Sequence, residues 1–170
     1  AEVSMCFTVD AAKQYIKDVN HPGVGHIIGD IFHMLCGESH ISEAILRAGD
    51  QLINLHVEDT NRLPLGNGMM DVDTIVRALY VMGYNTDGRF VTGEPLGPGR
   101  NSYAIMFGQH TGEAKDKLVR DTLYFREREE ELLAESSTIA PLDKCMHAQE
   151  DGQKAGLLLC YSAKANQKYY

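Results

Sequence analysis

Three apolar runs in the sequence each end in side chains that can bind metals or move protons. Asp30 and His33 follow the first run, His56 and Arg62 lie at and after the end of the second, and Glu94 follows the third. Carboxylate and imidazole groups that converge on one point bind divalent ions such as Mn²⁺, Mg²⁺, Co²⁺ or Zn²⁺. Taken singly, each residue has a simpler explanation as a helix cap, a turn residue or a polar residue at a strand end. Their repetition at the same end of successive elements favours a divalent metal site.

The elements that must position these side chains follow from the periodicity of the apolar residues. Apolar residues at helical spacing predict helices, and short apolar runs predict strands, the first of which is consistent with a buried strand. The expected helices span residues 10–19, 41–48, 71–82 and 113–135, and the expected strands span 24–29, 51–57 and 89–93. Alternating helices and strands are typical of an α/β fold with a parallel sheet and right-handed crossovers. In such folds the chemistry lies at the carboxyl ends of the strands.

The composition describes a globular chain and excludes several classes of function. The 170 residues are 44% apolar and 24% charged, and 16 basic against 24 acidic residues give a net charge of -8. A negative field of this kind repels phosphate backbones, so nucleic acid is not expected as a ligand. No apolar stretch approaches the ~18 residues that span a bilayer, so a membrane is not expected either. The lack of a basic leader and of a C-x-x-C pair among the four cysteines predicts a cytoplasmic protein with free thiols.

Four sequence motifs, in order along the chain, resemble those of a known family. Residues 30–34 (DIFHM) are similar to D-x-F-H-M, and residues 56–62 (HVEDTNR) are similar to H-x-x-[ED]-x-N-R. Residues 64–71 (PLGNGMMD) resemble a P-G-x-G-x-x-D loop, with Leu65 altering its first spacing, and residues 91–95 (VTGEP) resemble V-x-x-E-P. On these motifs the chain resembles the xylose isomerase-like TIM-barrel family, which includes sugar isomerases, ketose 3-epimerases, hydroxypyruvate isomerases and inosose dehydratases.

The resemblance implies a role for each of the five residues at the strand ends. Asp30, His56 and Glu94 match three of the family's four metal ligands, and Mn²⁺ is the first candidate among the divalent ions. His33 and Arg62 match groups that hold sugar oxygens near the metal. Glu94 also matches one of the two metal-bound glutamates that exchange a proton with the substrate carbon in the epimerases. The resemblance places the fourth ligand and the other catalytic glutamate before the first residues of this sequence.

The resemblance covers about residues 2–135 and corresponds to the last three strands of a (β/α)₈ barrel. We therefore expect residues 1–135 to form a partial barrel and residues 136–170 to form a tail outside the repeating βα unit. Three parallel strands cannot close a barrel, and they leave two open edges. A second chain or a missing N-terminal segment is therefore expected to complete the sheet, and the isolated chain is expected to form an oligomer.

These features support one leading hypothesis and several alternatives. The leading hypothesis is the C-terminal part of a divalent-metal-dependent sugar isomerase or epimerase. It would act on a sugar or keto sugar by proton transfer next to a metal-bound keto group. The alternatives are a non-catalytic half-barrel that pairs with another chain, and a dehydratase or C-glycoside-cleaving lyase of the same family. Phosphodiester cleavage, the chemistry of the remote endonuclease IV-like branch, ranks last because of the negative net charge.

Overall fold

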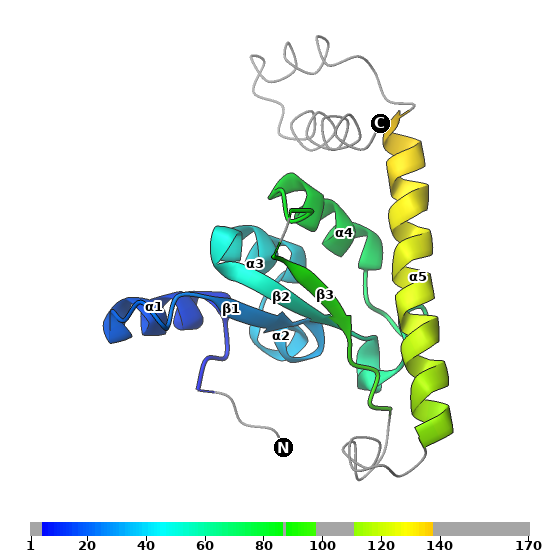
Figure 1. The fold of residues 1–170 in the computed structure, drawn as a ribbon, viewed down its shortest axis with the longest axis horizontal. Helices are drawn as coiled ribbons and strands as arrows, with labels where there is room; N and C mark the ends of the chain where they lie inside the picture. The colour runs from blue at the N-terminus through cyan, green and yellow to red at the C-terminus, as the bar shows by residue number, and fades with distance from the viewer. Residues whose placement is uncertain (1–4, 87, 98–110, 138–170) are drawn as a thin grey trace.

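The computed structural model describes residues 5–86, 88–97 and 111–137 (Figure 1). Its helices are α1 (Val9–Val19), α2 (Ile31–Gly37), α3 (Ile41–Ala48), α4 (Val72–Val81) and α5 (Thr111–Ser137), and its strands are β1 (Ile27–Asp30), β2 (Leu52–Val57) and β3 (Phe90–Gly93). Two short 3₁₀ turns, Gly49–Gln51 and Thr60–Arg62, follow α3 and β2. None of the helices in these ranges is both long and apolar enough to cross a membrane.

The order of helices and strands agrees with the α/β prediction. Helix α3 has the predicted bounds, and the other predicted elements agree to within three residues at each end. Helix α2 was not predicted, because its seven residues are too few to show helical periodicity. Its sequence signal is Asp30, whose Oδ1 accepts hydrogen bonds from the N–H groups of Phe32 (3.0 Å) and His33 (3.1 Å) and so caps the helix. Residues 138–170, most of the predicted tail, lie outside the described residues.

The three strands form one parallel sheet in the order β1-β2-β3. Asp30 of β1 pairs with His56 of β2, and His56 pairs with Thr92 of β3. The carboxyl ends of the strands are therefore level with one another. Side chains at or just after these ends must lie close together, as the sequence pattern requires.

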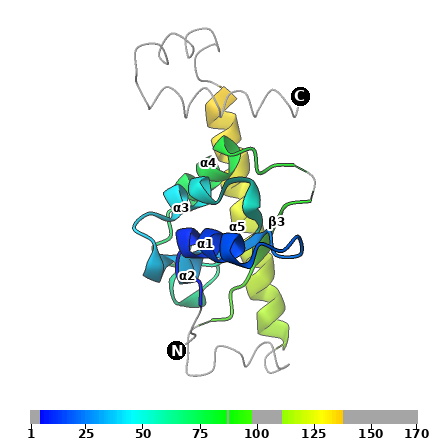
Figure 2. The ribbon, with the colours of Figure 1, turned by 90° about the vertical axis from the view of Figure 1, so that its left-hand side faces the viewer.

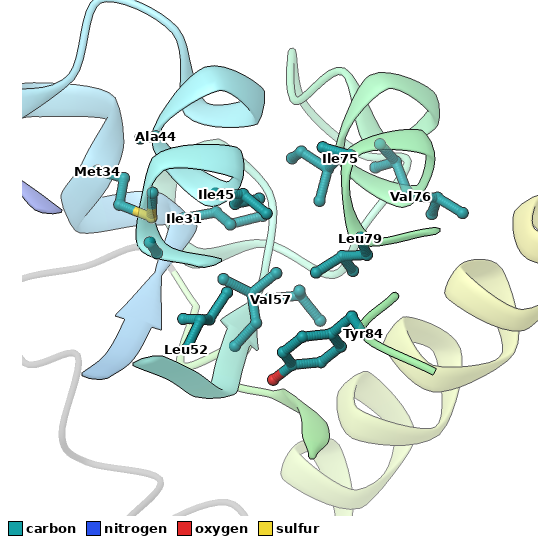
Figure 3. Packing of buried hydrophobic residues seen from close by; sticks show 14 of the residues in the cluster. Ile31, Met34, Ala44, Ile45, Leu52, Val57, Ile75, Val76, Leu79 and Tyr84 are labelled. Carbon is teal, nitrogen blue, oxygen red and sulfur yellow. The ribbon is translucent and has the colours of Figure 1, made fainter. Parts of the chain in front are cut away.

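One face of the sheet is covered by α3 and α4, whose apolar side chains point toward β2 (Figure 3). Ile45 of α3 and Leu52 of β2 are at most 1% exposed and belong to one apolar cluster. In α4 the buried residues recur at helical spacing, at Val72, Ile75, Val76 and Leu79. Each fully buried aliphatic side chain of this kind contributes about 1.5–3 kcal/mol relative to an exposed position. This layer holds β2, and with it His56, in place.

The opposite face of the sheet is open in the described part of the chain. Ile28 and Phe90 pair with Asn54 from either side, and each is 62% exposed. Residues two apart in a strand share a face, so Asp30 and His56 lie on this same open face. Among the described residues, β1 and β3 each pair along one edge only. An exposed apolar row and two unpaired edges are the features that the partial-barrel prediction requires.

Helix α5 lies beside β3 and α4, on the side of the sheet away from α1 (Figures 1 and 2). Arg128 of α5 donates from Nε and Nη2 to the two carboxylate oxygens of Asp73, at 2.8 and 2.7 Å. The Tyr80 hydroxyl donates to Oε1 of Glu129 at 2.6 Å. These bonds fix α5 to α4, and α5 also contacts β3 directly.

Candidate metal centre

The three predicted metal ligands meet at the carboxyl ends of the strands. Asp30 ends β1, His56 is the last residue but one of β2, and Glu94 directly follows β3. The Glu94 N–H donates to the Val57 carbonyl at 2.9 Å, which extends the β2–β3 pairing by one residue. One potential ligand atom from each of the three residues lies within 4.8 Å of the other two. Two carboxylate oxygens and one imidazole nitrogen at this separation form a candidate site for a divalent metal ion.

The two predicted sugar-binding residues join the same polar network. Oε2 of Glu94 lies 3.2 Å from Nδ1 of His56 and accepts a hydrogen bond from Nη1 of Arg62 at 3.3 Å. Nη2 of Arg62 lies 2.9 Å from Nε2 of His33, which accepts the bond because a guanidinium only donates. Nε2 of His33 is in turn 3.6 Å from Oδ2 of Asp30. The structure therefore brings all five predicted site residues together.

The turn after β2 directs the Arg62 side chain toward Glu94. Asn61 and Arg62 both have left-handed backbone angles, with φ of 59° and 55°. Such angles cost about 1–3 kcal/mol at a residue other than glycine and are held by surrounding contacts. Here the Arg62 carbonyl accepts a 2.7 Å bond from the Gly97 N–H, and the guanidinium carbon lies 4.8 Å from the centre of the Phe32 ring. The result is a guanidinium that is almost fully buried yet faces the candidate metal centre.

A further carboxylate, Glu58, lies against the predicted ligand Asp30. Glu58 is 0% exposed, and its Oε1 accepts the N–H of Phe32 at 3.3 Å. Burial, and next the contact with Asp30, raise the pKa of Glu58 to about 10. Burial alone would raise the pKa of Asp30, but the contact with Glu58 and the N–H of His33 outweigh it, so the pKa of Asp30 is lowered. A proton shared between the two acids therefore belongs mainly to Glu58.

The donor set and the local charge both fit a divalent cation. Asp30 and Glu94 bring two carboxylates to one place, where Arg62 is a cationic partner, and Glu58 adds a third carboxyl group that keeps its proton in the absence of a cation. Oε2 of Glu58 is buried and has no hydrogen-bond partner among the described residues. Buried acidic groups in excess of their partners are stabilised by a bound cation. Asp30, His56 and Glu94 would hold such an ion, which would supply Lewis-acid chemistry at the strand ends.

Comparisons with known proteins place this arrangement in a family. The family model described as xylose isomerase-like TIM barrel matches residues 1–103. The chain belongs to this family. The resemblance read from the sequence motifs is therefore confirmed, and the three-stranded sheet with its associated helices is part of a TIM-barrel fold.

Several curated proteins that the chain matches are sugar epimerases. The chain is 33% identical to the ketose 3-epimerase of Arthrobacter globiformis over 85 residues, which are 49% of this chain and 29% of that protein. It is 31% identical to the 3-dehydro-D-guloside 4-epimerase of Escherichia coli K12 over 108 residues, 60% of this chain and 40% of that protein. The chain thus spans less than half the length of these curated relatives.

Solved structures support the same fold. The structure of L-ribulose 3-epimerase superposes with a TM-score of 0.65 at 19% identity, covering 82% of this chain and 49% of that one. The D-psicose 3-epimerase of Clostridium cellulolyticum H10 with D-tagatose gives a TM-score of 0.54 at 28% identity, covering 73% and 43%. This chain therefore matches about half of each of these two structures.

Three buried acids near the site were not predicted from the sequence. Glu58 and Asp59 lie inside the H-x-x-[ED]-x-N-R motif, so the motif itself was their only signal. Asp121 lies in the charged helix α5, where nothing in the sequence separates it from the solvent-exposed acids around it. All three are at most 1% exposed.

Proposed function

We propose that this chain provides part of the active site of a divalent-metal-dependent sugar epimerase, with Mn²⁺ as the favoured ion. The observation that carries the proposal is the meeting of Asp30, His56 and Glu94 at level strand ends in a chain of this family. The names of these two relatives, a ketose 3-epimerase and a 3-dehydro-D-guloside 4-epimerase, support a sugar or keto sugar as the substrate class.

Glu94, His33 and Arg62 have different roles in the proposed reaction. The ion, when bound, would polarise the keto oxygen of the sugar and so acidify the neighbouring carbon. Glu94 would take up or return the proton at that carbon, because its Oε2 is held by His56 and Arg62 at the edge of the open face. His33 and Arg62 would bind sugar hydroxyls, since imidazole and guanidinium groups offer directional hydrogen bonds.

Epimerisation at one carbon needs proton transfer on both of its faces, and Glu94 can serve only one. We therefore propose that further strands bring the second acid–base group and the remaining metal ligand. The support comes from the described part of the sheet, where Ile28 and Phe90 are exposed on either side of Asn54 and the two outer edges are unpaired, as additional strands would require. These strands come from another chain or from an additional N-terminal segment, and the assembled enzyme is expected to be an oligomer.

A Glu94→Gln variant tests the proposal. Variants are expressed in the source organism, so that any chain or segment completing the barrel is present. Loss of a well-placed acid–base group lowers kcat by about 10²–10⁴-fold. We expect that loss on a ketose substrate, with KM changed much less. The control is Glu43→Gln, an exposed acid of α3. Equal kcat values for Glu94→Gln and Glu43→Gln would remove Glu94 from the mechanism.

A further inference from the structure

The loop that carries Arg62 is closed at its base by Asp59. Oδ1 of Asp59 accepts the N–H of Thr60 at 2.8 Å and the N–H of Met70 at 3.0 Å. The Asp59 N–H donates to the Leu63 carbonyl at 2.7 Å. We call residues 59–70 the Arg62 loop. Because Asp59 is the second residue after the end of β2, the base of the loop lies next to the strand that carries His56.

The middle of the Arg62 loop is held from outside by α5. Oδ1 of Asp121 accepts the N–H of Leu65 at 2.8 Å, and both residues are at most 2% exposed. Tyr124, nearly one turn further along α5, packs on Gly66. A Cβ at Gly66 would lie 2.4 Å from Tyr124 Cε2, and Gly66 has a φ of +81°. Two side chains of one helix thus hold two consecutive residues of the loop.

The same carboxylate also lies against the end of β3. A Cβ at Gly93 would be 2.5 Å from Oδ2 of Asp121, so only glycine leaves room for this oxygen. Gly93 directly precedes Glu94 in the sequence. Asp121 therefore contacts both the loop that carries Arg62 and the residue beside Glu94.

We propose that Asp121 is a positioning residue that sets Arg62 relative to Glu94, an inference that rests on the proposed epimerase function. Arg62 reaches Glu94 at 3.3 Å and His33 at 2.9 Å from a left-handed backbone. Those distances depend on the loop keeping one path between Asp59 and Met70. The bond from Leu65 to Asp121 fixes that path at its middle.

A purely stabilising role explains Asp121 less well. Its Oδ2 is buried and has no hydrogen-bond partner among the described residues. Burial raises the pKa of Asp121 to about 7, which means that an ionised carboxylate is costly at this position. Buried, incompletely paired acids with shifted pKa values cluster at functional sites, and Asp121 lies beside one.

The test compares Asp121→Asn, which keeps an acceptor for Leu65, with Asp121→Ala, which removes it. Asp121→Ser is a milder removal, for use if the alanine variant does not fold. Asp116→Asn, an exposed acid of the same helix, is the control. Amide hydrogen exchange measures how often the Leu65 N–H opens to solvent. The line width of the Arg62 guanidinium NMR signal measures how well ordered that side chain is. Loss of one hydrogen bond should speed exchange at Leu65 by about three- to tenfold in Asp121→Ala and leave Asp121→Asn and Asp116→Asn near wild type.

Steady-state kinetics distinguish a specific displacement of Arg62 from a general loss of order in the protein. In Asp121→Ala we expect KM for the ketose to rise and the Mn²⁺ affinity to stay within about threefold, since none of the three ligands is in the loop. In an Arg62→Ala background the Asp121→Ala change should add no further rise in KM, because the two residues act as one unit. Additive effects on KM, or an Asp121→Asn variant as impaired as Asp121→Ala, would overturn the inference.

If the wild-type protein turns over no sugar, the proposed function fails. In that case the Arg62 signal still decides the inference: a signal equally sharp in wild type and Asp121→Ala refutes it.

Discussion

The buried carboxyl of Asp121 makes a quantitative prediction about stability and pH. Burial raises its pKa from 3.8 to about 7; the N–H of Leu65 opposes this shift and Asp59 adds to it. Between these two values the folded state holds a proton that the unfolded state has released. The group therefore stabilises the fold most at low pH, and that stabilisation is lost as the pH rises toward 7.

The size of the effect follows from the linkage relation. Each pH unit inside the window changes the free energy of unfolding by about 1.4 kcal/mol. From pH 5 to pH 8 only the two units below the folded pKa count, which gives a loss of at most about 2.7 kcal/mol. Asparagine does not titrate, so Asp121→Asn lacks this loss. The free energy of unfolding of Asp121→Asn minus that of wild type should therefore be larger at pH 8 than at pH 5, by up to this amount.

Urea unfolding of wild type, Asp121→Asn and the exposed control Asp116→Asn at pH 5, 6, 7 and 8 measures this difference. Groups that titrate equally in all three proteins cancel in the comparison, so only the difference between slopes is used. If wild type and Asp121→Asn lose stability in parallel over this range, Asp121 is not a buried acid of raised pKa, and its placement between the loop and β3 is wrong.

Three further predictions follow from the contacts described above. Wild type should gain about 2.7 kcal/mol of stability at Mn²⁺ one hundred times its Kd, and His56→Ala should lose most of that gain; an unchanged metal-induced shift in Tm would show that the ligand set is wrong. Gly66→Ala should destabilise the fold by about 1–3 kcal/mol, because its φ is +81° and its Cβ would meet Tyr124; a stability equal to wild type by urea unfolding would contradict the packing of α5 on the loop. The isolated chain should self-associate at micromolar concentration through its open face, and the double change Ile28→Ser with Phe90→Ser should weaken that association in sedimentation; equal association in both would place the contact elsewhere.

The main elements and the five proposed site residues could be predicted because their signals are local. The runs that became β2 and β3 are short and mainly apolar, and the predicted site residues lie at or just after their ends. Parallel strands with level carboxyl ends then bring Asp30, His56 and Glu94 together without any further information.

The features that were missed depend on contacts between distant residues. Helix α2 is set by one capping side chain rather than by a periodic pattern. The raised pKa of Glu58 comes from burial against Asp30, which lies 28 positions earlier in the sequence. Asp121 meets Leu65 across 56 positions, in a helix where other described acids such as Asp116 and Glu127 are exposed. No residue type or spacing encodes such contacts in a single sequence.

The central claim is that this chain contributes to proton transfer at a carbon next to a keto group. The most direct measurement is the incorporation of solvent deuterium during turnover of a ketose by the Mn²⁺-loaded protein, with every strand that completes the barrel present. The account predicts one deuterium at the epimerised carbon of the product, and its loss together with turnover in Glu94→Gln. Turnover in D₂O that leaves this carbon without deuterium would contradict proton exchange through Glu94 and point to a hydride shift.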